Sequence, residues 1–331
     1  MLKLAILDDY LHMAKKVADW SELEKRVEMT VFDRNLKVPD EAAEVLAPYH
    51  IQCHLRERMP VPRALFDKLP NLRYVAATGV KHRTLDYDAA TERGIPVSHS
   101  GQYSAESGFG STAELAIGMM ISLSRMIPRF DADMRKGAWQ NQVGSSLAGR
   151  RVGLVGLGNI GKNVARACQM FDAEVVAWSP NLTEERLAGT GVKLASKDEL
   201  FATADIISFH IVLGESTRGL ITAHELGLMK PTAYIVNTSR GPLIEEKALM
   251  DVLSNHKIAG AGIDTYWDEP LSPDHPIRKL DNVLITPHVG YVTTQGLAGF
   301  YKATIENVMA FLDGKPIRVL NPEAGAGNPR E

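Results

Sequence analysis

Residues 151–161 read Arg-Val-Gly-Leu-Val-Gly-Leu-Gly-Asn-Ile-Gly, and they carry the strongest fold signal in the chain. An apolar strand pattern comes first, glycines follow at positions 156, 158 and 161, and residues 162–170 have the spacing of a helix. In a strand–turn–helix unit this glycine spacing is typical of a dinucleotide site. Gly156 allows the tight turn, Gly158 lets the backbone approach a pyrophosphate, and Gly161 lets helix and strand pack closely. Unpaired amides at the start of the helix would attract the phosphates.

On both sides of this unit, short apolar runs alternate with helical stretches. Six runs from residue 151 onward predict a doubly wound parallel sheet of the Rossmann type. Five runs in the first hundred residues predict a smaller parallel sheet with helices on both faces. The six runs cover residues 152–155, 175–178, 206–211, 233–237, 259–263 and 283–286, and the five cover residues 2–7, 27–32, 51–55, 74–77 and 95–97.

The order of these runs predicts two domains, one inserted in the other. The dinucleotide-binding block starts after residue 100 and ends near residue 290, and a last helix follows it. We therefore expect an NAD(P)-binding Rossmann domain over residues 104–293. It would be inserted in a smaller, flavodoxin-like α/β domain made of residues 1–103 and 294–331. Ser111-Thr-Ala-Glu114 predicts a capping box at the start of an apolar helix.

Composition excludes several classes of protein. The 331 residues are 45% hydrophobic and 23% charged, with a formal charge of −3. This balance is ordinary for a soluble globular protein. It indicates neither a basic surface for binding nucleic acid nor a polybasic patch for binding a membrane. Because we find no signal peptide and no long apolar run, we expect a cytoplasmic protein. The two cysteines, Cys53 and Cys168, form neither a disulfide framework nor a metal-spaced cluster, so no metal is expected.

Three chemically active side chains lie just beyond predicted strands, at the edge where open α/β sheets bind ligands. Arg240 has a planar guanidinium that suits a two-point grip on a carboxylate. His288 can give or take a proton near neutral pH. A carboxylate from Glu269 would fix the imidazole tautomer and favour its charged form. Together the three residues suit hydride transfer to a carbonyl beside a carboxylate.

The second strand of a dinucleotide-binding sheet usually ends in an acid that binds ribose hydroxyls. Ser179 stands at that place in this chain, within Ala177-Trp-Ser-Pro-Asn. A neutral serine would not repel the 2′-phosphate of NADP, but no arginine follows directly to attract one. These residues leave the choice between NAD and NADP open.

Taken in order, these segments resemble the D-isomer-specific 2-hydroxyacid dehydrogenase family, from the first strand to Asn321. The resemblance implies that Arg240, Glu269 and His288 are the catalytic set. It also implies that the turn with Gly79 and Val80 receives the substrate carboxylate, which Arg240 binds too. Further matching stretches are residues 137–139, 205–210, 217–221, 228–231 and 281–288. The expected cofactor-binding residues are Gly156, Gly158, Asn159, Ile160, Gly161, Ser179, Thr238 and Asp264, the last at the nicotinamide.

The expected activity is hydride transfer between NAD(P)H and C2 of a small 2-oxo acid or D-2-hydroxy acid. Two segments depart from the family pattern where substrate side-chain specificity would be set, so they leave the acid unnamed. These are residues 78–82, in place of the commoner Gly-x-Gly-x-Asp, and the long loop 98–111. We expect no regulatory domain after residue 331, which disfavours the longer, allosterically controlled phosphoglycerate dehydrogenases.

Two alternatives remain. A nucleotide-sensing co-repressor would use the same scaffold for binding without turnover. A formate- or phosphite-type dehydrogenase is the other, although formate enzymes usually carry Gln at the position of Glu269.

The apolar helix over residues 115–126 also predicts an oligomer. Its sequence is apolar on nearly every side, which one buried face cannot explain. An exposed patch of that size is unusual for a monomer. Burial inside the cofactor domain would be the simpler reading, but the family forms a two-fold contact through this helix. We therefore expect a homodimer.

Overall fold

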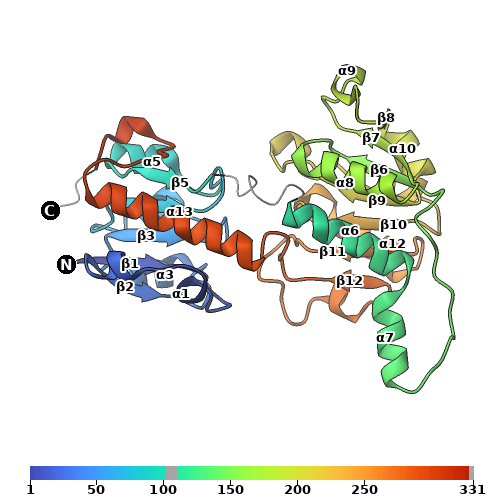
Figure 1. Cartoon of the computed structure of the whole chain (residues 1–331), viewed down its shortest axis with the longest axis horizontal. Helices are drawn as coiled ribbons and strands as arrows, with labels where there is room; N and C mark the ends of the chain where they lie inside the picture. The colour runs from blue at the N-terminus through green and yellow to red at the C-terminus, as the bar shows by residue number, and fades with distance from the viewer. Residues whose placement is uncertain (102–109, 328–331) are drawn as a thin grey trace. The chain divides into compact units, whose positions relative to one another are not determined.

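The computed structural model describes residues 1–101 and 110–327. The chain divides into two compact units (Figure 1). Unit 1 consists of Met1–Glu106 together with Val292–Glu331, and unit 2 consists of Ser107–Tyr291. Each unit is built on its own parallel sheet.

Unit 1 contains a five-stranded parallel sheet with the order β2-β1-β3-β4-β5. This is the flavodoxin-like order, in which the chain changes direction across the sheet between β1 and β3. The strands are β1 (Leu2–Ile6), β2 (Val27–Val31), β3 (Ile51–His54), β4 (Tyr74–Ala77) and β5 (Val97–His99), the last beginning two residues later than its predicted run.

Helices cover both faces of the unit 1 sheet. One face packs against α3, α4 and α5 through a fully apolar cluster. On the other face the long α13 lies against β4 and β5, and the rings of Tyr74 and Phe311 stack with centroids 4.3 Å apart. The helices are α1 (Ala14–Val17), α2 (Ser21–Glu24), α3 (Pro39–Leu46), α4 (Arg63–Phe66), α5 (Tyr87–Glu92) and α13 (Thr294–Leu312).

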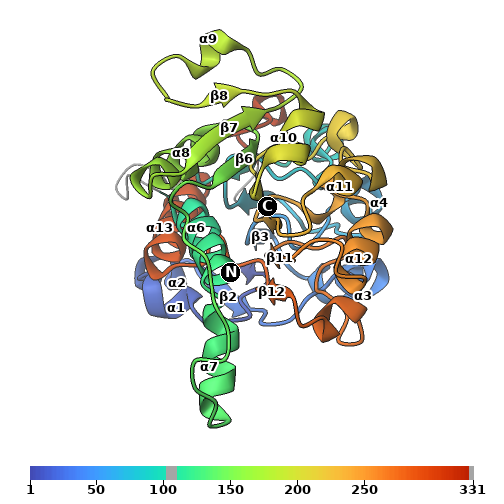
Figure 2. The same cartoon turned by 90° about the vertical axis from the view of Figure 1, so that its right-hand side faces the viewer.

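Unit 2 contains a seven-stranded parallel sheet with the order β12-β11-β10-β9-β6-β7-β8 (Figure 2). From β6 the chain first builds outward to β7 and β8, then returns to the other side of β6 with β9. This doubly wound order confirms the predicted Rossmann-type fold. The strands are β6 (Arg151–Val155), β7 (Glu174–Trp178), β8 (Lys193–Leu194), β9 (Ile206–Phe209), β10 (Tyr234–Asn237), β11 (Gly260–Ile263) and β12 (Val283–Ile285).

Two helical layers enclose the unit 2 sheet. One core lies between the sheet and α6 with α8, and the other between the sheet and α10, α11 and α12. Among the strands of the described residues, only the two-residue β8 was not predicted. The helices are α6 (Ser111–Ser124), α7 (Ile127–Arg135), α8 (Asn159–Met170), α9 (Glu184–Leu187), α10 (Lys197–Thr203), α11 (Ala223–Leu228) and α12 (Glu246–Ser254).

The start of α6 corrects the predicted capping box. The N-cap residue is Gly110, with φ 86°, and Ser111 is already the first helical residue. Glycine has no side chain to accept a hydrogen bond, so the reciprocal pair of Ser111 and Glu114 does not form. The preceding residues of the loop 98–111, from 102 to 109, lie outside the described part of the chain.

Neither α6 nor α7 is buried on all sides. In α6 one side is buried, with residues such as Ala116 and Met120 in the core, and the other side is partly exposed. No residue of α7 is buried, and this helix projects from the body of unit 2 (Figure 1). Among the residues that the structure describes, no helix has both the length and the apolar character needed to cross a bilayer.

Candidate active site

The glycine-rich turn lies at the point where the strand order of unit 2 reverses. Gly156 follows β6 with φ 100°, and a Cβ there would lie 2.7 Å from the carbonyl oxygen of His210, which follows β9. A Cβ on Gly161 would lie 2.4 Å from the carbonyl oxygen of Gly156. Both glycines are therefore required by close backbone packing, since any side chain would separate the turn from its neighbours.

Gly158 is different, because its surroundings are open. It is the N-cap of α8, and a Cβ placed on it would have no atom within 4 Å. Gly158, Asn159 and Ile160 are all exposed at the start of this helix. A helix N-terminus with free space above its backbone is the geometry that phosphate groups need.

Two polar atoms at the same edge of the unit 2 sheet support a ligand there. The hydroxyl of Thr238, which follows β10, is buried, and so is Nε2 of His210. Within the part of the chain that the structure describes, neither atom has a hydrogen-bonding partner. Buried polar groups are normally paired, so atoms of this kind fit a cofactor that brings its own hydrogen-bonding groups. The residues at this edge thus suit a dinucleotide.

Arg240, Glu269 and His288 all follow strands of the same parallel sheet, which brings them to its carboxyl edge. Arg240 begins the turn after β10, and Asn237 donates to its carbonyl oxygen at 3.0 Å. The Arg240 guanidinium donates to the carbonyl oxygen of Ser239 at 2.7 Å and is half-buried. Its backbone is therefore anchored by the end of the strand from which it emerges.

The imidazole of His288 is paired with the carboxylate of Glu269. Nδ1 of His288 lies 2.6 Å from Oε2 of Glu269, and Oε1 of Glu269 accepts the Tyr266 amide at 2.8 Å. Burial alone would raise the pKa of Glu269. The hydrogen bond and charge of His288, the Tyr266 amide and the charge of Arg240 outweigh burial and hold that pKa below its usual value. Glu269 is thus an ionised acceptor that leaves Nε2 of His288 for other groups.

The backbone of His288 is held in an uncommon conformation. Its φ is 54°, in the left-handed region that a residue with a Cβ adopts at a cost of about 1 kcal/mol. Asp264, at the end of β11, holds the segment that contains it. The fully buried carboxylate of Asp264 accepts the Thr286 hydroxyl at 2.5 Å, the Val289 amide at 2.8 Å and the Gly290 amide at 3.0 Å. These bonds fix the chain on both sides of the imidazole.

The sequence pointed to Asp264 only as a contact for the nicotinamide, which stays a prediction. Its hydrogen bonds to the His288 segment were missed, as was the Tyr266 amide that orients Glu269. The only sequence signal for them was that polar residues follow two neighbouring strands.

The turn at Gly79 lies in unit 1, after β4. Gly79 has φ 90°, and a Cβ there would lie 1.9 Å from Nη1 of Arg56. Its amide donates to the Ser100 hydroxyl at 2.8 Å, and Val80 is 46% exposed. Sequence reasoning did not identify Arg56 or Ser100 at this turn, because both are distant from it in the chain.

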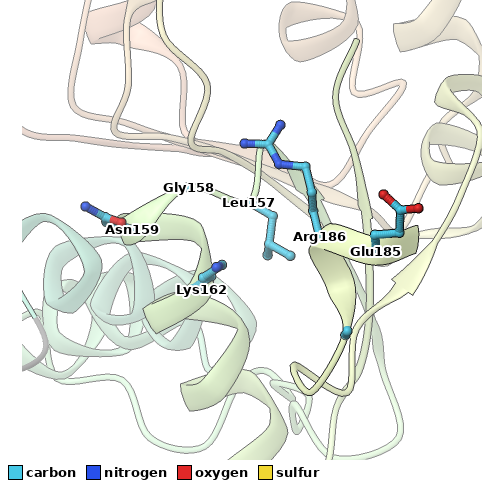
Figure 3. A pocket seen from close by; sticks show the side chains of 7 residues that line it. Leu157, Gly158, Asn159, Lys162, Glu185 and Arg186 are labelled. Carbon is cyan, nitrogen blue, oxygen red and sulfur yellow. The ribbon is translucent and has the colours of Figure 1, made fainter. Parts of the chain in front are cut away.

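A hollow of about 410 Å³ opens beside the glycine-rich turn (Figure 3). Gly158, Asn159 and Lys162 line it from α8, and Glu185 and Arg186 line it from α9. The basic residues of this hollow were also missed by the sequence interpretation.

The chain is similar to known proteins of one enzyme family. Residues 117–290 match the family model described as "D-isomer specific 2-hydroxyacid dehydrogenase, NAD binding domain". The chain is 34% identical over 266 residues to a D-3-phosphoglycerate dehydrogenase of Archaeoglobus fulgidus, a match that covers 80% of this chain and 50% of that protein. It is 32% identical to a glyoxylate reductase of Korarchaeum cryptofilum, with 80% of each chain covered.

The fold has a close match among solved structures. A solved oxidoreductase from Ralstonia solanacearum superposes with a TM-score of 0.91 at 33% identity, over 98% of both chains. The chain therefore matches this structure over nearly its whole length, whereas it spans half the length of the Archaeoglobus relative.

Proposed function

The chain belongs to the D-isomer specific 2-hydroxyacid dehydrogenase family, and from that premise we propose that it interconverts a small 2-oxo acid and the corresponding D-2-hydroxy acid with a nicotinamide cofactor. The bound cofactor supplies or accepts the hydride at C2. The observation that carries the proposal is the 2.6 Å contact between His288 and Glu269, at the sheet edge that also presents Arg240.

His288 is the proposed acid and base. Because Nδ1 is bound to Glu269, Nε2 is the nitrogen that exchanges a proton with the substrate oxygen at C2. During reduction His288 starts protonated and donates to that oxygen. During oxidation it starts neutral and accepts the hydroxyl proton. The ionised Glu269 stabilises the protonated form, so it favours the state that reduction needs.

Arg240 is the proposed carboxylate-binding residue. Its planar fork can donate two parallel hydrogen bonds to a carboxylate, and its charge can also polarise the neighbouring carbonyl. In unit 1 we propose that the turn with Gly79 and Val80 receives the carboxylate. The hydroxyl of Ser100, which now accepts the Gly79 amide, can itself donate to such a group.

A His288→Gln variant tests the assignment. Turnover of 2-oxo acids should fall by about 10²–10⁴-fold, the usual contribution of a general acid. Cofactor affinity should stay within about twofold, because the phosphate site around Gly158 is untouched. The substrates are a panel of 2-oxo acids, each tested with NADH and with NADPH. Near-wild-type turnover of the variant would remove His288 from the mechanism. Cofactor binding without turnover of any acid would support the co-repressor alternative instead.

We also propose a homodimer that forms through α6 and α7. Large apolar side chains on α7 and the following loop are exposed: Ile127 by 50%, Met134 by 51%, Trp139 by 72% and Val143 by 92%. So much apolar surface on one projecting element is unusual unless a partner covers it.

Light scattering should therefore give a particle near twice the 36.3 kDa chain mass. Met134→Asp should shift it toward the monomer, whereas Met170→Asp, at a methionine that is 78% exposed at the end of α8, should not. A wild-type particle of single-chain mass at micromolar concentration would contradict the dimer.

A further inference from the structure

We propose that the hollow between α8 and α9 binds the 2′-phosphate of NADP(H), so that this chain prefers the phosphorylated dinucleotide. The inference rests on the proposed function, because it concerns the adenosine half of the same cofactor. It adds a specific anion site, built by Arg186 and Lys162, and a selectivity between two cofactors.

The first argument concerns the position of the hollow relative to the expected cofactor. Its walls include Gly158 and Asn159 at the start of α8, where the pyrophosphate is expected. In a doubly wound sheet the adenosine half extends from there toward the end of the second strand, which is β7 in this unit. The turn directly after β7 begins at Ser179, whose carbonyl oxygen accepts the Leu182 amide at 3.1 Å. The 2′-position of the ribose therefore belongs at this turn.

The second argument concerns Arg186, whose side chain contacts the turn after β7. Although it lies on α9, its Nη1 donates to the carbonyl oxygen of Asn181 at 3.0 Å. A guanidinium has five donors, so this bond leaves others for a phosphate. Figure 3 shows the Arg186 side chain extending over Leu157 toward the glycine-rich turn. Arginine at the ribose edge is the arrangement that accommodates a 2′-phosphate.

The other side chains in and near the hollow also favour a bound phosphate. Lys162, on the first turn of α8, adds a second positive charge to the wall. Ser179, at the start of the turn after β7, is neutral, whereas a carboxylate at that turn would repel the phosphate. Glu185 is the acidic residue among those that line the hollow, and Figure 3 shows its carboxylate directed away from Arg186.

The test measures binding without turnover. Isothermal titration of the wild type compares NADPH with NADH, and 2′,5′-ADP with 5′-ADP. The two nucleotides lack the nicotinamide and isolate the 2′-phosphate. Each 2′-phosphorylated ligand should bind on the order of tenfold more tightly than the matching ligand without that phosphate, as expected for hydrogen bonds between charged groups. Raising the salt concentration should reduce this advantage, because the site is exposed.

Variants assign the effect to the residues. Arg186→Gln should weaken NADPH and 2′,5′-ADP by on the order of tenfold and leave NADH within about twofold. Lys162→Gln should act in the same direction with a smaller loss. Lys247→Gln removes a positive charge from the exposed face of α12 and should change nothing. Ser179→Asp should reverse the preference toward NADH, because the new carboxylate would accept from the ribose hydroxyls and repel the phosphate.

Two results would overturn the inference. One is a wild type that binds NADH as tightly as NADPH and 5′-ADP as tightly as 2′,5′-ADP, a comparison that needs no variant to fold. The other is an Arg186→Gln variant that weakens both dinucleotides equally. Turnover with NADH alone would leave the proposed function intact, whereas binding of neither dinucleotide would overturn the proposed function itself.

Discussion

Replacing Glu269 with glutamine tests whether the carboxylate sets the proton affinity of the His288 imidazole, the proposed acid and base, or only holds its position. The substitution keeps the shape of the side chain, and the amide oxygen can still accept the Tyr266 amide. The amide nitrogen, however, meets Nδ1 of His288, which lies 2.6 Å from Oε2 in the native pair. That nitrogen is a donor, so it can pair only with a neutral imidazole. The variant therefore loses both a charge and an acceptor for the protonated form.

The size of the effect follows from the distance and the exposure. Two unit charges about 4 Å apart attract by about 4 kcal/mol at the effective dielectric of a protein surface. The side chains of His288 and Glu269 are 25% and 32% exposed, so solvent screens part of this attraction. Because a hydrogen bond between charged groups contributes about 1.5–3 kcal/mol, we expect reduction by the variant to fall on the order of 10- to 100-fold at high pH.

The assay is the pH dependence of kcat/KM in both directions. In reduction the protonated imidazole is required, so activity is lost as pH rises, and in Glu269→Gln this loss should begin at lower pH. In oxidation the neutral imidazole is required, so the rise of activity with pH should also begin at lower pH. Both profiles should move the same way, and reduction should lose most at high pH.

A matched control exists in the same unit. Glu246 also contacts an imidazole, with Oε1 2.9 Å from Nε2 of His275. Glu246→Gln removes a carboxylate from a histidine without touching the candidate site, and it should leave both profiles in place. The reasoning fails if Glu269→Gln lowers activity equally at every pH, since that result describes a purely positional role. It also fails if the control shifts the profiles as much.

Three further predictions concern other residues. Arg240→Lys should reduce kcat/KM on the order of 10- to 100-fold despite its retained charge, because an ammonium cannot make the two-point contact; recovery of most of the wild-type value would show that Arg240 acts only as a distant charge. Gly79→Ala should cost about 1–2 kcal/mol in urea unfolding, because of the positive φ, and should raise KM for the 2-oxo acid by displacing Arg56; unchanged KM would separate the turn from the substrate. Burial lowers the pKa of His82 to about 4, so the unfolded chain binds a proton that the folded chain refuses as pH falls from about 6.5. Stability of unit 1 should then fall by up to about 1.4 kcal/mol per pH unit toward pH 4, and His82→Gln should flatten this slope in pH-dependent unfolding; an unchanged slope would contradict the assignment.

The sequence was sufficient for the longer elements because their apolar periodicity is strong. Buried parallel strands are continuous apolar runs, and every such run that was predicted is a strand of one of the two sheets. The two-residue β8 was not found, because Lys193 and Leu194 are exposed and show no apolar pattern. The capping box failed for a different reason. Ser111 and Glu114 have the right spacing, but Gly110, with its positive φ, is the N-cap, so the helix begins one residue earlier than the motif predicts.

The candidate site was predictable to the extent that topology decides it. In a parallel sheet the ends of neighbouring strands meet at one edge, so residues after β10, β11 and β12 had to lie near one another. The Glu269–His288 pair follows from that rule together with the chemistry of the two side chains. Arg186 did not follow from it. Arg186 lies on α9, yet its side chain reaches back to the turn that follows β7. That contact depends on how α9 packs, which the residue spacing in the sequence does not show.

The conformation of His288 shows why a residue's identity alone did not describe the site. A left-handed backbone at a histidine costs folding energy and persists only where neighbouring groups determine it. Asp264 is such a group, because its buried carboxylate accepts three hydrogen bonds from the segment around His288. Burial, the largest influence, raises the pKa of Asp264 even against these bonds, so the protein keeps an acid in an unfavourable environment to hold this segment. The strain at His288 and the burial of Asp264 are thus two parts of one device. Their common effect is an imidazole whose orientation is fixed by the protein before any substrate binds, so the proposed proton transfer would require no reorganisation of the donor.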